Sequence, residues 1–157
     1  MNFTVLVGDM KTGQNGDTLV THALGSCLGL MVFDPAAKVG GLLHAMLPLS
    51  GINPEKARAN PAMFVDTGVP LLFKTLYDQG AEKARMVVKA AGCGTPMGQN
   101  EVFKIGARNY TVLKKLLWKN GISLEAEDVG GPASRTIHFE VSNGRVLLSS
   151  NGTKRPL

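Results

Sequence analysis

Glycine interrupts this chain so often that only short regular elements fit between the interruptions. The sequence has 19 glycines in 157 residues, several of them in tight groups at Gly40-Gly41, Gly92 and Gly94, and Gly130-Gly131. Glycine permits tight turns and close approach of two backbone segments. No apolar run approaches the roughly 20 residues needed to span a bilayer. The pattern predicts short elements joined by many turns.

Apolar segments bounded by turn residues predict strands. Leu28 to Phe33 ends at the turn signal Asp34-Pro35, and Gly41 to Leu47 ends at Pro48. The expected strands are 3–7, 28–33, 41–47, 85–91, 122–127, 135–141 and 145–149, the last two joined as a hairpin by Ser142-Asn143-Gly144.

Two segments predict helices. Asn60-Pro61 is a start signal, since Asn can cap free amides and Pro costs nothing at the first helical position. That helix should run towards Gln79, with a kink or break at Pro70. The second should cover 105–120, with one face formed by Asn109, Leu113, Leu116, Leu117 and Asn120.

The remaining segment, 49–60, is polar and predicts a surface loop. Interspersed strands and helices with a terminal hairpin favour the α+β class. We therefore expect one domain over 1–157, a sandwich of mixed β-sheet with helices.

Composition narrows the classes of function. The net charge is +5 with a pI near 9.4, but the cations are spread along the chain and aromatic residues are few. No nucleic-acid module is recognisable, so an acidic protein surface is the better expected partner. The N-terminus lacks a secretory pattern, which predicts a cytoplasmic protein without membrane insertion whose two cysteines are reduced.

The pentad Gly25-Ser26-Cys27-Leu28-Gly29 carries the strongest chemical signal. It places a cysteine where a nucleophile elbow has serine, and its glycines could turn the N–H groups near Ser26 and Leu28 towards a carbonyl as an oxyanion hole. An elbow needs a following helix, however, and 28–33 reads as a strand. The alternative is a small buried thiol in the core.

His44 lies in an apolar strand where an imidazole has no evident packing role. A cysteine nucleophile needs a base, and histidine suits that task at neutral pH. The strands carrying Cys27 and His44 are joined by a short turn and should pair. Thr21 could orient the imidazole as the third member of a triad. The alternatives are a core histidine bonded to a carbonyl and an ordinary strand threonine.

The other candidate residues carry weaker signals. His138 alternates with apolar neighbours and should point off the core face, and His22 should project away from Thr21. Cys93 could lie near the site, although a second buried thiol is the simpler interpretation. The cysteines and histidines lack metal-ligand spacing, and no phosphate-binding loop or dinucleotide fingerprint is present, so we expect no metal and no cofactor.

Four segments taken together resemble the CheD family of chemoreceptor glutamine deamidases. They are 24–27 (LGSC), 38–48 (KVGGLLHAMLP), 105–109 (IGARN) and 125–131 (EAEDVGG). The resemblance covers nearly the whole chain, in the expected order and spacing.

The resemblance implies that the family's catalytic cysteine, histidine and threonine fall on Cys27, His44 and Thr21. It implies conversion of particular glutamines to glutamates on the helices of chemoreceptors. It also implies binding to the phosphatase CheC, and an α/β sandwich distantly like the catalytic domains of glutamine-deamidating toxins. Two alternatives stay open: a non-catalytic regulator of CheC, and an unrelated amidase or thiol hydrolase acting on small molecules.

Overall fold

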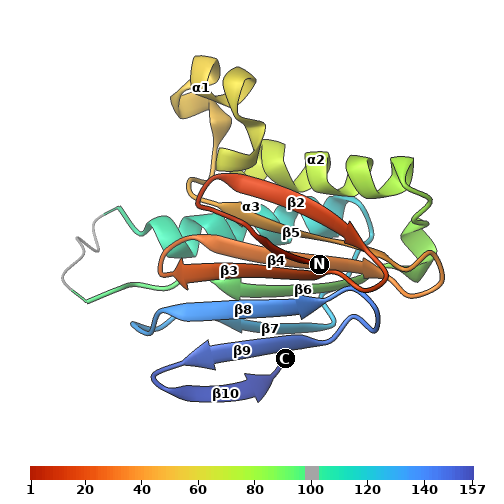
Figure 1. Cartoon of the computed structure of the whole chain (residues 1–157). Coiled ribbons are helices and arrows are strands. Elements are labelled where there is room, and N and C mark those ends of the chain that lie inside the picture. The colour runs from red at the N-terminus through yellow and green to blue at the C-terminus, as the bar shows by residue number, and fades with distance from the viewer. Residues whose placement is uncertain (98–102) are drawn as a thin grey trace.

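The computed structural model describes residues 1–97 and 103–157, and over these residues the chain forms two β-sheets and three α-helices (Figure 1). The outer sheet has the order β1 (Asn2–Thr4), β3 (Thr18–Leu24), β8 (Arg135–Glu140), β9 (Val146–Ser150), β10 (Thr153–Pro156). The central sheet has the order β2 (Asp9–Gln14), β5 (Val39–Ala45), β4 (Leu28–Asp34), β6 (Val87–Gly92), β7 (Ala126–Val129). The helices are α1 (Pro54–Ala59), α2 (Val65–Asp78) and α3 (Ile105–Lys119).

The central sheet is covered on both faces. Every residue of β4 and β5 is buried, which explains why their sequences are almost continuously apolar. Along β4, Leu28, Leu30 and Val32 belong to the core shared with α2 and α3. Met31 and Phe33 belong to the core between the two sheets. The molecule is therefore three-layered, in the order outer sheet, central sheet, helices, and the expected α+β sandwich is confirmed.

The outer sheet shows the alternation of a sheet with one solvated face. Along β8, Ile137 and Phe139 are buried between the sheets, while Thr136 and His138 lie on the other face. β8 and β9 form the expected terminal hairpin, and β10 adds a further strand that the sequence analysis did not anticipate.

The second predicted helix is confirmed, as α3. Its buried residues are Gly106, Asn109, Leu113 and Leu117, so most of the predicted face is correct, but Asn120 is exposed beyond the last helical turn. Gly121 follows with φ of 67°, the conformation that ends many helices.

The region around the first predicted helix differs from expectation. The loop predicted over 49–60 contains α1, because Asn53-Pro54 is the same capping signal as Asn60-Pro61, and the Asn53 side chain accepts from the Lys56 N–H. Asn60-Pro61 opens only a short 3₁₀ turn, and α2 begins at Val65.

Pro70 does not break α2, which continues to Asp78. The proline lies on the exposed side of the helix, where a carbonyl without its helical partner can bond to water. Four predicted strands also shift by two residues or more at one or both ends: the first ends at Thr4 rather than Val7, and the strands predicted over 41–47, 85–91 and 122–127 occupy Val39–Ala45, Val87–Gly92 and Ala126–Val129. β2 and most of β3 were not predicted as strands, because their many polar residues obscure the two-residue alternation of apolar and polar side chains.

Candidate functional site

His44 lies on β5, and Cys27 directly precedes the neighbouring strand β4; both lie on the face towards the outer sheet. β4 and β5 are antiparallel, and His44 stands opposite Gly29. Cys27 comes two residues before Gly29, so its side chain is on the same face and diagonal to His44. Such diagonal neighbours are about 7–8 Å apart, within reach of an imidazole. Cys27 is partly buried against the core between the sheets, and His44 is fully buried.

Thr21, on the outer sheet, contacts His44 across the space between the two sheets. Its Oγ1 lies 2.7 Å from His44 Nδ1 and also donates to the Val5 carbonyl at 2.7 Å. A hydroxyl has one hydrogen, and Val5 takes it. Thr21 must therefore accept a hydrogen from Nδ1, which fixes the proton of the neutral imidazole on Nδ1 and leaves a lone pair on Nε2. Nε2 is buried and has no partner among the described residues.

Burial sets the resting protonation of the pair. It raises the pKa of the Cys27 thiol and lowers the pKa of His44 to about 4. Near pH 7 the two groups are therefore a thiol and a neutral imidazole with its lone pair available. This arrangement can take a proton from the thiol during attack on a carbonyl, and it does not hold a standing thiolate.

The segment that carries Cys27 is fixed by hydrogen bonds that its backbone carbonyls accept. Gly25 O accepts from the Gly94 N–H and Cys27 O accepts from the Cys93 N–H, both at 2.8 Å. Ser26 O accepts from Asn109 Nδ2 at 3.0 Å. Among residues 1–97 and 103–157, the N–H groups of Ser26 and Cys27 have no acceptor. Leu28 is the first residue of β4, with its side chain towards the helices.

The other sequence candidates lie apart from this arrangement. Cys93 is buried on the helical side of the central sheet, and burial raises the pKa of its thiol to about 12, so it is chemically quiet. His138 lies off the core face, as predicted, and His22 is exposed. Asn109 was assigned only to a helix face; its contact with Ser26 required the fold to be known.

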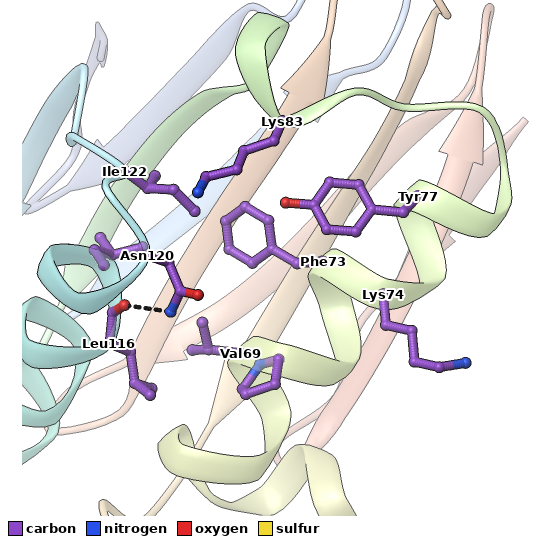
Figure 2. Close-up of a pocket in the computed structure, with 10 residues that line it drawn as sticks. Val69, Phe73, Lys74, Tyr77, Lys83, Leu116, Asn120 and Ile122 are labelled. Atoms are coloured by element: carbon purple, nitrogen blue, oxygen red, sulfur yellow. Dashed lines mark hydrogen bonds between the residues drawn. The ribbon is translucent and has the colours of Figure 1, made fainter.

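The groove between α2 and α3 contains none of the three candidate catalytic residues. Figure 2 shows its walls, formed mainly by Val69, Phe73, Tyr77, Leu116 and Ile122. Its lining is mostly apolar, and it lies on the far side of the helical layer from the inter-sheet face that carries Cys27 and His44.

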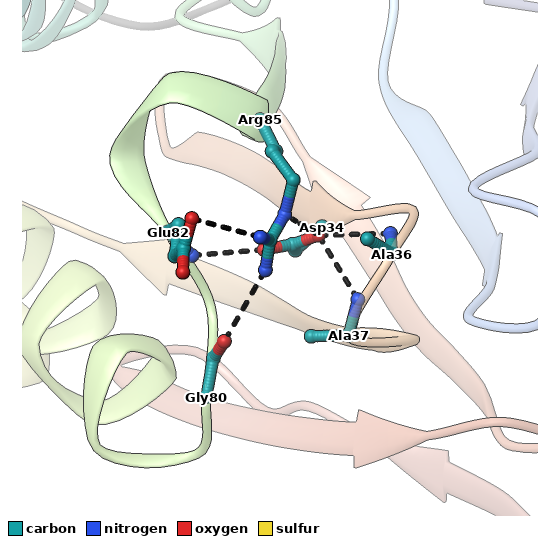
Figure 3. A network of polar contacts seen from close by, with 6 residues as sticks. All are labelled: Asp34, Ala36, Ala37, Gly80, Glu82 and Arg85. Carbon is teal, nitrogen blue, oxygen red and sulfur yellow. Dashed lines mark hydrogen bonds and ion pairs between the residues drawn. The ribbon is translucent and has the colours of Figure 1, made fainter.

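An ion-pair network centred on the buried Asp34 lies at the other end of β4 from Cys27 (Figure 3). Asp34, fully buried, accepts from Arg85 Nε and Nη2 and from the N–H groups of Ala36, Ala37 and Glu82. Burial alone would raise the pKa of Asp34, but Arg85 and the three N–H donors hold it well below its usual range. The network joins the β4–β5 turn to the segment before β6, a structural role.

Two further features bear on the class of protein. Over the described ranges, no helix is long and apolar enough to cross a membrane. Within the same residues, no three His, Cys, Asp or Glu side chains gather in a way that could hold a metal ion.

Comparison with known proteins gives consistent matches along the chain. Residues 46–150 match the family model described as CheD chemotactic sensory transduction. This match begins after Cys27 and His44, but matches to whole proteins include them. "Probable chemoreceptor glutamine deamidase CheD 1" of Syntrophus aciditrophicus is 44% identical over 94% of this chain and 93% of its own.

Two other relatives bear the name "Probable chemoreceptor glutamine deamidase CheD". The one from Solibacter usitatus is 47% identical over 96% of this chain and 90% of its own. The one from Pyrococcus horikoshii is 44% identical over 90% of this chain and 88% of its own. A solved Neisseria meningitidis structure of the DUF152 family overlays with a TM-score of 0.44 and 12% identity over 82% of this chain and 62% of that chain, a likeness too weak to support a conclusion. On the family match and the relatives, this chain belongs to the CheD family.

Proposed function

We propose that this protein hydrolyses the side-chain amide of particular glutamines on the cytoplasmic helices of chemoreceptors, converting them to glutamates. Its membership of the CheD family and the names of its relatives support the substrate class. The arrangement of Cys27, His44 and Thr21 supports amide hydrolysis through a cysteine nucleophile.

The observation that carries the proposal is the hydrogen bond between Thr21 and His44. Because Thr21 Oγ1 gives its hydrogen to Val5 O, it holds the Nδ1–H tautomer of His44. The remaining nitrogen, Nε2, is then the acceptor that a thiol needs. A histidine kept only for packing would be expected to bond through both nitrogens, whereas Nε2 is unpaired among the described residues.

In the first half of the reaction, His44 Nε2 takes the Cys27 proton as Sγ attacks the side-chain carbonyl carbon of glutamine. The carbonyl electrons move onto oxygen, and N–H groups of the Ser26–Leu28 segment stabilise that charge. The tetrahedral intermediate collapses as the carbon–nitrogen bond breaks. His44 gives its proton to the leaving nitrogen, and ammonia departs from a thioester.

In the second half, His44 takes a proton from water, and the hydroxide attacks the thioester carbon. The carbon–sulfur bond breaks, the thiolate regains the proton from His44, and glutamate is released. The net reaction consumes one water and releases one ammonia. The product adds a negative charge to the receptor helix, which changes its electrostatics and creates a carboxylate that can be methylated.

The test is incubation of the purified protein with chemoreceptor cytoplasmic fragments, followed by peptide mass spectrometry for glutamine-to-glutamate conversion. Wild-type protein should convert discrete helix glutamines, and Cys27→Ala should convert none while keeping the wild-type melting temperature. Conversion by Cys27→Ala would overturn the assignment of the nucleophile. Turnover of free glutamine with no conversion of receptor would favour a small-molecule amidase.

Binding to the phosphatase CheC is a second proposal that rests on the family resemblance alone. A folded wild-type protein that binds CheC tightly and converts no receptor glutamine would be a regulator without catalysis. The buried His44 Nε2, without a partner among the described residues, argues against that outcome, because a binding module has no need of a free imidazole nitrogen in its core.

A further inference from the structure

Asn109 connects the helical layer to both halves of the candidate site. It lies on α3 and is fully buried. Its Nδ2 donates to Ser26 O at 3.0 Å and to Met46 O at 3.3 Å. Ser26 directly precedes Cys27, and Met46 comes two residues after His44. One amide group therefore ties the segment of the nucleophile to the end of the strand that carries the base.

The close approach of α3 depends on Gly106. A Cβ at this position would lie 2.1 Å from Gly94 O and 2.7 Å from the Cys93 carbonyl carbon. Both atoms are backbone and could not be moved aside cheaply. The first turn of α3 is therefore packed directly on the loop after β6, one helical turn from Asn109.

The same loop holds the other two carbonyls of the nucleophile segment. Gly94 and Cys93 donate to Gly25 O and Cys27 O. Together with Asn109, these contacts take up the carbonyls of three successive residues. In a planar trans peptide, the carbonyl and the N–H of the next residue point in opposite directions. Each fixed carbonyl therefore turns the following N–H away from its anchor, and the Ser26 carbonyl is paired in this way with the Cys27 N–H.

Asn109 has an unusual hydrogen-bond balance for a core residue. Its Oδ1 is buried and has no partner among the described residues. A buried amide with an unpaired oxygen costs free energy that a leucine at this position would not. The donor side of the amide is fully used, however, and both of its acceptors belong to the site.

We propose that Asn109 is a positioning residue for the reaction: by holding the Ser26 carbonyl, it directs the Cys27 N–H into the oxyanion hole. This inference rests on the proposed deamidation, and it adds a member from the helical layer to the site. Asn109 does not touch the substrate, and its contribution passes through the Ser26–Cys27 peptide group.

The experiment compares Asn109→Ala and Asn109→Ser with wild type, and uses Asn120→Ala as the matched control. Asn120 lies just after α3, is exposed, and donates to Leu116 O. For each protein we would measure kcat and KM on chemoreceptor fragments and the rate at which iodoacetamide alkylates Cys27. Alkylation is a direct displacement that forms no oxyanion, so it reports the thiol and His44 without the oxyanion hole.

Both Asn109 variants should lose kcat by about 100-fold, the scale of a 1 Å misplacement, with KM little changed. Their alkylation rate and its pH dependence should match wild type, and Asn120→Ala should match wild type throughout. A folded Asn109 variant with wild-type kcat would overturn the inference and leave the deamidase proposal standing. Parallel loss of kcat and of alkylation would reduce Asn109 to a structural residue. Inactive wild-type protein would overturn both proposals.

A measurement on the wild-type chain covers the case in which both variants fail to fold. Butyraldehyde resembles the glutamine side chain, with an aldehyde in place of the amide. The Cys27 sulfur adds to the aldehyde carbon, and the thiol proton passes to the aldehyde oxygen. In a crystal structure of this adduct, that oxygen should accept from the Cys27 N–H while Asn109 still holds Ser26. An oxygen directed away from Cys27 N–H would overturn the inference.

Discussion

Thr21 and His44 belong to different sheets, and yet a 2.7 Å contact between Oγ1 and Nδ1 sets which nitrogen of the imidazole carries the hydrogen and which keeps its lone pair. The direction of this hydrogen bond follows from the second contact of the hydroxyl, with Val5 O. The Val5 carbonyl thus sets the direction of both hydrogen bonds, from Thr21 to Val5 and from His44 to Thr21.

Thr21→Val should lower kcat by roughly 10- to 100-fold, because an unpaired buried N–H on His44 costs about 1–3 kcal/mol and the tautomer is no longer fixed. Thr21→Ser keeps the hydroxyl and should retain most of the rate. Steady-state kinetics on receptor fragments would check both. Equal rates for the valine variant and wild type would leave Thr21 as a strand residue without a catalytic part.

The pH dependence of kcat/KM should show an acid limb near pH 4 rather than near 6.5, because burial lowers the pKa of His44 to about 4 and activity needs the neutral base. Initial rates of ammonia release between pH 3 and 8 would locate the limb. A limb at the ordinary histidine value would show that His44 is more hydrated than its burial indicates.

The same shift affects stability. His44 has a lower pKa folded than unfolded, so between pH 6.5 and 4 the unfolded chain binds more protons and stability falls as the pH falls. The loss should be at most about 3.5 kcal/mol, since the pKa shift from 6.5 to about 4 corresponds to about 1.4 kcal/mol per pKa unit. Urea unfolding at several pH values would measure it, and His44→Gln should remove this part of the pH dependence.

Gly106→Ala should destabilise the protein by about 1–3 kcal/mol, since the new methyl group would meet backbone atoms of Gly94 and Cys93. It should also slow deamidation, because α3 must move away from the loop that supports the nucleophile. Gly51→Ala is the control, since nothing lies within 4 Å of its Cβ position. Thermal melts and kcat would be compared, and matching values for the two variants would contradict the close packing of α3.

Asp34→Asn should destabilise the fold by about 1–3 kcal/mol, because an amide replaces a fully buried carboxylate that accepts from Arg85 and from three backbone N–H groups. Cys27 alkylation should stay unchanged in the folded variant, since Asp34 lies at the far end of β4. Asp78→Asn breaks only the exposed pair with Lys74 and should cost less than about 0.5 kcal/mol. Chemical denaturation of both variants would measure these losses in the free energy of unfolding. Equal losses for Asp34→Asn and Asp78→Asn would show that the network around Asp34 does not stabilise the fold.

The sequence allowed the elements around Cys27 and His44 to be predicted because these strands are buried on both faces and carry an uninterrupted apolar signal. β2 and β3 were missed or placed loosely, since their polar residues obscure any period. The Asn-Pro signal occurs twice, at 53–54 and 60–61, and the local sequence does not show which copy begins an α-helix. Asn53-Pro54 begins α1 and Asn60-Pro61 begins a 3₁₀ turn, a difference that depends on tertiary packing.

The pairing of β4 with β5, which brings the segment of Cys27 next to the strand of His44, could be inferred from chain order, because a short turn joins the two strands. The position of Thr21 could not, since it depends on how the second sheet packs over the first. Asn109 was recognised only as part of a helix face. Its function as a donor depends on the position of α3, which is set by the contact of Gly106 with the backbone of Cys93 and Gly94.

Each layer of the molecule supplies one part of the candidate site: Thr21 comes from the outer sheet, His44 and the segment leading into β4 with Cys27 from the central sheet, and Asn109 from the helices. Opening of any layer therefore separates the base from its anchor or frees the nucleophile segment. A newly made or partly unfolded chain would carry a thiol without its base, and the proposed amide hydrolysis would be confined to fully folded molecules.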